Sequence, residues 1–215
     1  MHYTSILFDL DGTLLDTIGD LTAAMNRTLT RHGLPERTRQ QMRAALGNGA
    51  RRLMELSVPT GTDSALFETL LAEYNADYAA HCRIETAPYP GVAALLRTLH
   101  AQGRKLAIVS NKPDEAVRAL RADFFADAVQ IAVGETAAIR RKPAPDMLLA
   151  AMEQLGAAPD KTVFVGDSEV DIATARAANL PCISVLWGFR DRDVLERAGA
   201  QQFAADIAQL QALLG

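Results

Sequence analysis

Two carboxylates stand two positions apart near the start of the chain, directly after a short apolar run. Asp9 and Asp11 follow residues 5–8, Ser-Ile-Leu-Phe, and Gly12 and Thr13 come next. Glycine lets the backbone turn at this point and bring N–H groups close to an anion. One carboxylate of the pair can attack phosphorus as a nucleophile, which divides a difficult transfer into two easier steps. Taken alone, the pair could instead cap the helix expected from about residue 16. The choice between the two roles therefore depends on the other polar clusters of the chain.

A second acidic cluster follows another apolar run, with Asp167 and Asp171 in Gly-Asp-Ser-Glu-Val-Asp over residues 166–171. Acids from the two clusters would repel each other at one site unless a cation lies between them. Mg²⁺ suits this set of donors because it takes oxygen ligands, accepts few carboxylates and keeps water and substrate phosphate around it. Ser168 and Asp171 also match a helix capping box, a structural role that is compatible with support of a metal.

Hydroxyl, amide and ammonium groups come from two other places in the chain. Ser110, Asn111 and Lys112 follow a third apolar run, and Lys142 precedes Pro143, which keeps the local chain out of a regular helix. We interpret Lys112 as a solvated or framing charge rather than a catalytic one. Carboxylates, a hard metal ion, a hydroxyl and an ammonium together predict a site for phosphoryl transfer, where catalysis consists mostly of positioning and charge neutralisation.

Elements that could position these groups are visible in the hydrophobic pattern. The apolar runs at 5–8, 106–109 and 162–165 are continuous rather than alternating, as is typical of parallel strands covered by helices on both faces. Further strands are expected over 129–133 and 182–186, and helices over 92–100, 114–122, 145–155 and 168–179. This alternation predicts a doubly wound, Rossmann-like α/β sheet. Because ligands of such sheets bind beyond the carboxyl ends of the strands, the clusters should converge on one crevice.

Residues 16–85 interrupt the alternation of strands and helices. Apolar residues recur there at helical spacing, at 18, 21, 25 and 29 and again at 67, 70, 74 and 78. Two prolines and a glycine within residues 86–91 then stop any helix. We therefore expect an α/β core made of 1–15 and 86–215, with an all-helical domain of residues 16–85 inserted after the first strand.

The order and spacing of the four clusters resemble the motifs of the haloacid dehalogenase superfamily of phosphohydrolases. Its first motif is similar to Asp9-x-Asp11-Gly12-Thr13, its second to Ser110-Asn111-Lys112, its third to Lys142 with Pro143, and its fourth to Gly166-Asp167-Ser168-x-x-Asp171. The resemblance covers essentially the whole chain. It implies a Rossmann-like core, Mg²⁺ as the cofactor and an aspartyl-phosphate intermediate.

Roles for individual residues follow from this resemblance. It implies that Asp9 is the nucleophile and that Asp11 is the acid/base, which favours a phosphatase over a dehalogenase. Asp9, the backbone carbonyl of Asp11, and Asp167 would hold the metal, with support from Asp171. Lys142 would offset the charge on Asp9. The residues expected to bind the phosphoryl group, besides Lys142, are Gly12, Thr13, Ser110 and Asn111.

The helical insertion has the place of the superfamily's cap domain. Its segment 47–54, Gly-Asn-Gly-Ala-Arg-Arg-Leu-Met, is similar to the phosphoglycolate phosphatase branch, as is Trp-Gly-Phe at 187–189, whereas Glu135 stands where many members carry Asp. The resemblance implies 2-phosphoglycolate as substrate. Asn48, Arg51 and Arg52 are then candidates for contacts with the leaving group, since a guanidinium can bind a carboxylate through two hydrogen bonds. Both arginines could equally belong to a solvated helical face.

Composition limits the partners. The chain has 215 residues with 22 basic and 26 acidic side chains, and a net charge of −4 does not suggest a nucleic-acid partner. No apolar stretch approaches the roughly 20 residues that span a bilayer, so we expect no membrane partner and a cytoplasmic location. The expected partner is a small phosphorylated metabolite, and the expected assembly is a monomer or homodimer. A sugar phosphomutase and a non-catalytic phosphometabolite-binding protein remain as alternatives.

Overall fold

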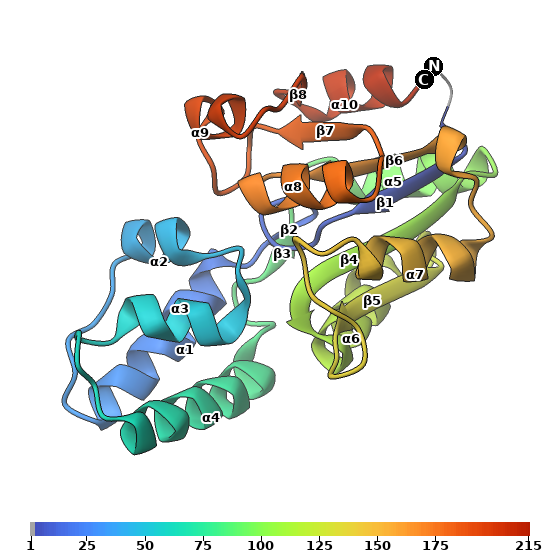
Figure 1. Ribbon diagram of the computed structural model, residues 1–215. Coiled ribbons are helices and arrows are strands. Elements are labelled where there is room, and N and C mark those ends of the chain that lie inside the picture. The colour runs from blue at the N-terminus through green and yellow to red at the C-terminus, as the bar shows by residue number, and fades with distance from the viewer. Residues whose placement is uncertain (1–2) are drawn as a thin grey trace. The chain divides into compact units, whose positions relative to one another are not determined.

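A six-stranded parallel sheet forms the centre of the larger of two structural units (Figure 1). The computed structural model describes residues 3–215, so residues 1 and 2 of the expected core range 1–15 lie outside it. One unit consists of Met1–Leu15 and Pro88–Gly215, and the other of Asp16–Ala87. The second boundary therefore lies two residues later than the expectation from the sequence.

The sheet has the strand order β5-β4-β1-β6-β7-β8. Its strands are β1 (Ser5–Phe8), β4 (Lys105–Pro113), β5 (Ile131–Glu135), β6 (Thr162–Gly166), β7 (Cys182–Val185) and β8 (Gln202–Ala204). The chain builds outward from β1 through β4 to β5, then returns to the other side of β1 and builds outward again. This is the doubly wound order, which confirms the predicted fold class. Phe8 at the end of β1 stands opposite both Ile108 and Val165, so three strands deliver their following residues to one edge.

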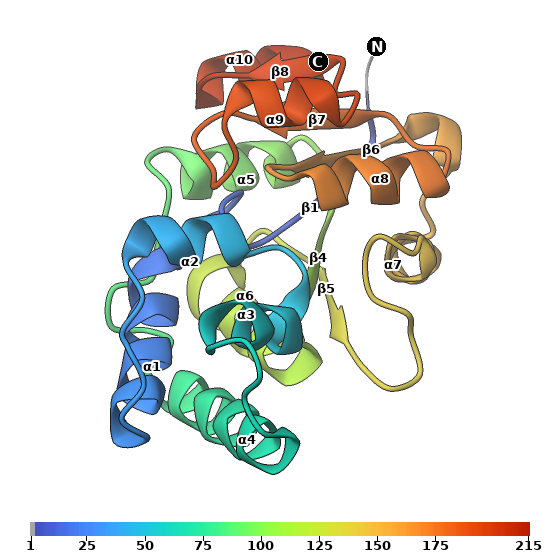
Figure 2. The ribbon, with the colours of Figure 1, turned by 60° about the vertical axis from the view of Figure 1, so that its left-hand side comes forward.

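Helices cover both faces of this sheet, which explains the continuous apolar runs. The helices are α5 (Val92–Ala101), α6 (Asp114–Phe125), α7 (Asp146–Leu155), α8 (Glu169–Ala177), α9 (Arg192–Arg197) and α10 (Ile207–Leu214), with a short 3₁₀ turn at Pro159–Lys161. Leu7 and Phe164 are fully buried in one cluster with Met147 of α7 and Ala175 of α8, and α5 and α6 lie on the opposite face (Figure 1, Figure 2). Burial of each of the larger side chains, Leu7, Met147 and Phe164, contributes roughly 1.5–3 kcal/mol relative to exposure.

The observed elements differ from the expected ones mainly at their ends. Strand β5 begins two residues later than expected because Val129 still belongs to the turn after α6, where its N–H bonds to Phe125. Helix α8 begins after Ser168, which is its N-cap residue, and ends before Asn179, which has a positive φ of 55°. Elements α9, β8 and α10 lie after residue 186, beyond the strands and helices predicted from the sequence, and the three-residue strand β8 is only partly buried.

The second unit, Asp16–Ala87, is built from helices α1 (Ile18–Arg31), α2 (Arg39–Ala45), α3 (Gly49–Ser57) and α4 (Ser64–His81). Helices α1 and α4 carry the two apolar repeats found in the sequence and pack against each other. Their contact includes a buried carboxylate, Asp77, which Arg27 and Arg31 approach to 2.6 and 3.2 Å. Pairing offsets the cost of burying this charge.

Two short strands, β2 (Leu15–Asp16) and β3 (Ala87–Pro88), pair where the chain passes from one unit to the other. Close to them, the buried carboxylate of Asp20 accepts hydrogen bonds from the backbone N–H groups of Ile84, Glu85 and Thr86 at 2.9–3.0 Å. The first helix of the unit is thereby tied to the segment that ends it. Within residues 3–215, no helix combines the length and the apolar character needed to cross a membrane.

Candidate active site

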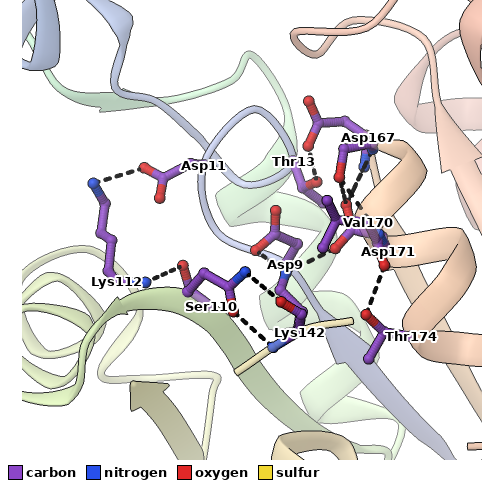
Figure 3. Close-up of polar contacts among 12 residues, drawn as sticks. Asp9, Asp11, Thr13, Ser110, Lys112, Lys142, Asp167, Val170, Asp171 and Thr174 are labelled. Carbon is purple, nitrogen blue, oxygen red and sulfur yellow. Dashed lines mark hydrogen bonds and ion pairs between the residues drawn. The ribbon is translucent and has the colours of Figure 1, made fainter. Parts of the chain in front are cut away.

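The polar clusters of the α/β unit meet beyond the carboxyl ends of β1, β4 and β6 (Figure 3). Asp9 follows β1 directly, and its N–H bonds to the Val165 carbonyl of β6 at 2.8 Å, which continues the strand pairing to the edge of the sheet. Ser110 lies within β4, and Asp167 follows β6. Residues that are more than 150 positions apart in the chain, such as Thr13 and Asp167, are therefore in direct contact.

The turn after Asp9 requires a glycine. Gly12 has a φ of +82°, and a Cβ atom at this position would lie 2.3 Å from Oδ2 of Asp167 and 2.9 Å from the Phe189 ring. Neither the conformation nor the space suits another residue. The turn brings the Thr13 hydroxyl to Asp167, where it donates to Oδ1 at 3.2 Å. Thr13 was expected to bind phosphate, but its hydroxyl in this structure orients a carboxylate.

Three buried carboxylates form the centre of the site. Asp9, Asp167 and Asp171 each place an oxygen within 4.8 Å of the other two. Burial raises the pKa of Asp9 well above its ordinary value, although Lys142 acts in the opposite direction. Burial and the neighbouring Asp171 together raise the pKa of Asp167 to about 7. A hard divalent cation would stabilise the ionised forms of such oxygen donors, so the residues fit the Mg²⁺ expected from the sequence.

Asp171 uses both of its oxygens for hydrogen bonds within the site. Its Oδ2 accepts from the Ser168 hydroxyl at 2.7 Å and from the N–H groups of Ser168 and Asp167 at 3.0 and 3.2 Å. Its Oδ1 accepts from Nζ of Lys142 at 2.7 Å. The predicted capping box at the start of α8 is confirmed. Asp171 thus supports the site by holding the loop of Asp167 and the side chain of Lys142.

Lys142 lies between two carboxylates. Its Nζ is 2.7 Å from Oδ1 of Asp9 and 2.7 Å from Oδ1 of Asp171, and its side chain is only 3% exposed. Burial disfavours the charged amine, but Asp171 and Asp9 outweigh this effect and raise the pKa of Lys142 above its ordinary value. The lysine therefore remains an ammonium that offsets the charge on Asp9, as the sequence predicts.

Asn111 holds the backbone of Lys142. Its Oδ1 accepts from the Lys142 N–H at 2.8 Å, and its Nδ2 donates to the Lys142 carbonyl at 3.0 Å. The peptide bond between Lys142 and Pro143 is cis. The side chain of Asn111, which was expected to bind phosphate, is thus engaged with a neighbouring loop. The sequence does not predict these two hydrogen bonds, because nothing in it distinguishes an asparagine that binds a backbone from any other asparagine.

Asp11 and Lys112 form a separate ion pair. Lys112 Nζ lies 3.1 Å from Oδ1 of Asp11, with side-chain exposures of 8% and 19%. Of the two roles considered for Lys112, the structure therefore supports a buried charge that frames the site by pairing with Asp11, and not a solvated one. Among residues 3–215, the group of carboxylates close enough to share a metal ion does not include Asp11. A contact of Asp11 with the metal through its backbone carbonyl stays a prediction.

A loop after β7 orients Asp167 from the other side. The Phe189 N–H donates to Oδ2 of Asp167 at 2.7 Å, and the Trp187 indole N–H donates to the Thr13 carbonyl at 3.1 Å. A Cβ atom at Gly188 would lie 2.3 Å from Cβ of Asp167. In the sequence this segment stands out only through the family resemblance, because a backbone donor leaves no signal of its own. The glycine was the one signal that could have indicated a close approach.

The three candidate residues of the helical unit lie at and near the start of α3. Asn48 is the N-cap residue, without a side-chain capping bond. Both guanidinium groups are bound by carboxylates on the exposed surface: Arg51 by Glu68 at 2.8 and 2.9 Å, and Arg52 by Glu55 at 2.8 Å. A substrate anion would have to compete with these partners, and recognition by the three residues stays a prediction.

Comparisons with known proteins agree with one another. A family described as haloacid dehalogenase-like hydrolase matches residues 6–185. A phosphoglycolate phosphatase of Xanthomonas campestris is 35% identical over 187 residues, 86% of this chain and 84% of the relative. An N-acetylmuramic acid 6-phosphate phosphatase of Pseudomonas aeruginosa is 33% identical over 190 residues, 88% and 84% of the two chains. One similar solved structure is a crystal structure of a protein from Lactobacillus delbrueckii that is proposed to be a phosphoglycolate phosphatase. It superposes on this chain with a TM-score of 0.94 at 35% identity, and the match covers 100% of this chain and 99% of that one.

Proposed function

The chain belongs to the haloacid dehalogenase-like hydrolase family, and from this premise we propose that it is a magnesium-dependent phosphomonoesterase that acts on a small phosphorylated metabolite through a phosphorylated Asp9. The observation that carries the proposal is the environment of Asp9. Its carboxylate lies at the end of β1, bonded to the ammonium of Lys142 and close to the carboxylates of Asp167 and Asp171. A nucleophile in this place stays ionised beside an incoming phosphate dianion only if positive charge surrounds it.

Two chemical steps follow from this arrangement. In the first, an oxygen of Asp9 forms a bond to phosphorus while the ester oxygen leaves and takes a proton from the Asp11 carboxyl group. In the second, Asp11 accepts a proton from water, whose oxygen attacks phosphorus and releases phosphate and the Asp9 carboxylate. Lys142 and the hydroxyl of Ser110 bind the phosphoryl oxygens during both steps. The covalent intermediate divides one difficult transfer into two easier steps, and Asp11 moves the proton in each.

The metal would be held by the carboxylates of Asp9 and Asp167 and by the backbone carbonyl of Asp11. When bound, Mg²⁺ neutralises negative charge on the phosphoryl group. Thr13 and the Phe189 N–H keep the Asp167 carboxylate in one orientation for this purpose. Oriented ligands favour binding, because less side-chain freedom is lost when the ion enters.

For the substrate we propose 2-phosphoglycolate, which would be hydrolysed to glycolate and phosphate. Several relatives carry the name phosphoglycolate phosphatase, and they are 32–35% identical to this chain. The relative named for N-acetylmuramic acid 6-phosphate widens the choice to sugar phosphates. The location in the cytoplasm and the monomer or homodimer stay predictions.

A panel of phosphate esters tests the proposed function. With Mg²⁺, the wild type should release phosphate from 2-phosphoglycolate with the highest kcat/KM in the panel, and a chelator should abolish the release. Asp9→Asn should abolish turnover of every ester because no nucleophile remains. Accumulation of an isomerised sugar phosphate without free phosphate would indicate a phosphomutase. No turnover of any ester, including 4-nitrophenyl phosphate, would indicate a binding protein and contradict the proposal.

The role of the arginines in α3 is tested with the same panel. If Arg51 or Arg52 binds the carboxylate of the substrate, its replacement by alanine should raise KM for 2-phosphoglycolate and leave KM for 4-nitrophenyl phosphate unchanged. Equal losses on both esters would contradict this role.

A further inference from the structure

Lys112 is a buried cation whose ammonium group contacts the acid/base candidate. Its Nζ lies 3.1 Å from the Asp11 carboxylate, and its side chain is 8% exposed. Figure 3 shows the Asp11 carboxylate directed toward Lys112 and away from Asp167 and Asp171. The two lysines of the site therefore pair with different carboxylates: Lys142 with Asp9 and Asp171, and Lys112 with Asp11.

Lys112 starts from a fixed position in the sheet. It belongs to β4, and its backbone N–H points to the Ser110 hydroxyl oxygen at 3.4 Å. Strand β5 passes close by, because a Cβ atom at Gly134 would lie 2.9 Å from the Lys112 carbonyl, and the Gly134 N–H bonds to Asp114 at 2.8 Å. Asp11 lies in the turn after β1, so the backbone of Lys112 belongs to a strand and that of Asp11 does not. A buried ammonium is costly without a counter-charge, which favours keeping the pair together.

We propose that Lys112 is a positioning residue that directs the Asp11 carboxyl group to the leaving-group oxygen. This inference rests on the proposed function. A general acid must lie within hydrogen-bond reach of the oxygen that it protonates, and small displacements reduce the rate strongly. Lys142, Asp9 and Asp171 hold one another through direct contacts that do not include Lys112. Loss of Lys112 therefore impairs protonation of the leaving group and spares the contacts that hold Asp9 for its attack on phosphorus.

Esters with different leaving groups distinguish this role from a merely structural one. An alkoxide is a poor leaving group and needs a proton as the bond to phosphorus breaks, whereas 4-nitrophenolate leaves without one. The quantity to compare is kcat/KM, which covers only the steps up to formation of the phosphorylated enzyme. Later hydrolysis of that intermediate, in which Asp11 acts as a base, does not enter it.

The experiment measures kcat/KM of the wild type, Lys112→Met and Lys112→Arg on two esters with Mg²⁺ present. One ester is 4-nitrophenyl phosphate. The other is the alkyl phosphate without a carboxylate that the wild type hydrolyses fastest.

In Lys112→Met, kcat/KM should fall at least about 10-fold on the alkyl ester and less than about threefold on the aryl ester, since a general acid contributes roughly 10²–10⁴-fold. Lys112→Arg keeps the cation and should keep the ratio of the two rates within about threefold of the wild type. Lys161→Met, a change at the other end of the sheet beside the start of β6, is the matched control and should alter neither rate.

Equal losses on the two esters in Lys112→Met, with a wild-type melting temperature, would overturn the inference alone, because Lys112 would then act on the phosphoryl group. A Lys112→Met variant that keeps the wild-type rate on the alkyl ester would also overturn it. If Lys112→Met is too unstable to purify, Lys112→Arg carries the test, and a changed rate ratio in that variant contradicts the inference. If the wild type hydrolyses neither ester, the proposed function itself is contradicted. This outcome differs from the others, in which the wild type is active and only the role of Lys112 fails.

Discussion

At the scale of single residues, the site depends on side chains that hold other side chains. Lys142 is the clearest case: two carboxylates bind its ammonium group, and Asn111 binds its backbone on both sides. The candidate reaction groups could be proposed from the sequence because only a few residue types are nucleophiles, acids or metal ligands. The supporting contact of Asn111 could not, because amides serve in many places and the loop that carries Lys142 comes next to β4 only in the folded chain.

Asn111→Ala should reduce both activity and stability. The change leaves the N–H and carbonyl of buried Lys142 without their partner, at about 1–3 kcal/mol for each group. A displaced Lys142 should lower kcat/KM on 4-nitrophenyl phosphate about 10- to 100-fold. Urea unfolding and steady-state kinetics measure the two effects.

The chain provides a matched control for this prediction. Asn26 makes the same reciprocal pair with the backbone of Arg37 in the helical unit, at 2.8 and 2.9 Å. Asn26→Ala should therefore lower stability without lowering kcat/KM on 4-nitrophenyl phosphate. Equal activity losses in the two variants would indicate that Asn111 acts only through stability.

At the scale of elements, parallel pairing explains why the clusters meet. Strands β1, β4 and β6 end at the same edge because β1 pairs in parallel with both of the others. The apolar runs before each cluster predicted these strands within a few residues. The loop of residues 187–189 was not predicted to touch Asp167, because its contact uses a backbone N–H and the absence of a side chain at Gly188.

Gly188→Ala should weaken Mg²⁺ binding. The added methyl group would lie 2.3 Å from Cβ of Asp167, so either the loop or the carboxylate must shift. Loss of such an orienting contact lowers metal affinity by about 10- to 100-fold in comparable sites. Isothermal titration of the metal-free protein with Mg²⁺ measures the change without any substrate.

Gly33→Ala serves as the control for the loop variant. Gly33 also lies outside regular helices, has a φ of +66° and has open space around its Cβ position. The substitution strains the backbone of the helical unit and not that of the α/β unit, which holds the site residues, so it should cost stability and leave the Mg²⁺ affinity unchanged. Unchanged affinity in Gly188→Ala would show that the loop does not orient Asp167.

At the scale of the whole molecule, the chain forms two units and leaves the α/β unit only once, between Leu15 and Pro88. An insertion of this kind needs its two ends held together, since they continue into one core. Asp20 does this within the helical unit, where its carboxylate accepts three backbone N–H groups of residues 84–86.

Asp20→Ala should release the end of the helical unit. Hydrogen bonds to a charged acceptor are worth about 1.5–3 kcal/mol each, so the three amides should lose at least about 2 kcal/mol of protection. Hydrogen exchange at Ile84, Glu85 and Thr86 measures the loss. Asp63→Ala, which removes two similar bonds at the start of α4, should leave these amides protected. Continued protection in Asp20→Ala would contradict the assignment.

By itself, the sequence determined the strands before each cluster, the helical insertion, the candidate reaction groups and the capping box at Ser168. These features depend on local spacing and on residue chemistry, which do not require knowledge of the tertiary contacts. Only the tertiary structure decided that Thr13 and Phe189 orient Asp167, that Asn111 holds Lys142, and that Lys112 pairs with Asp11. Such contacts join segments distant in sequence through backbone atoms and common polar side chains. Their partners come together only when β1, β4, β6 and β7 have paired in the folded sheet.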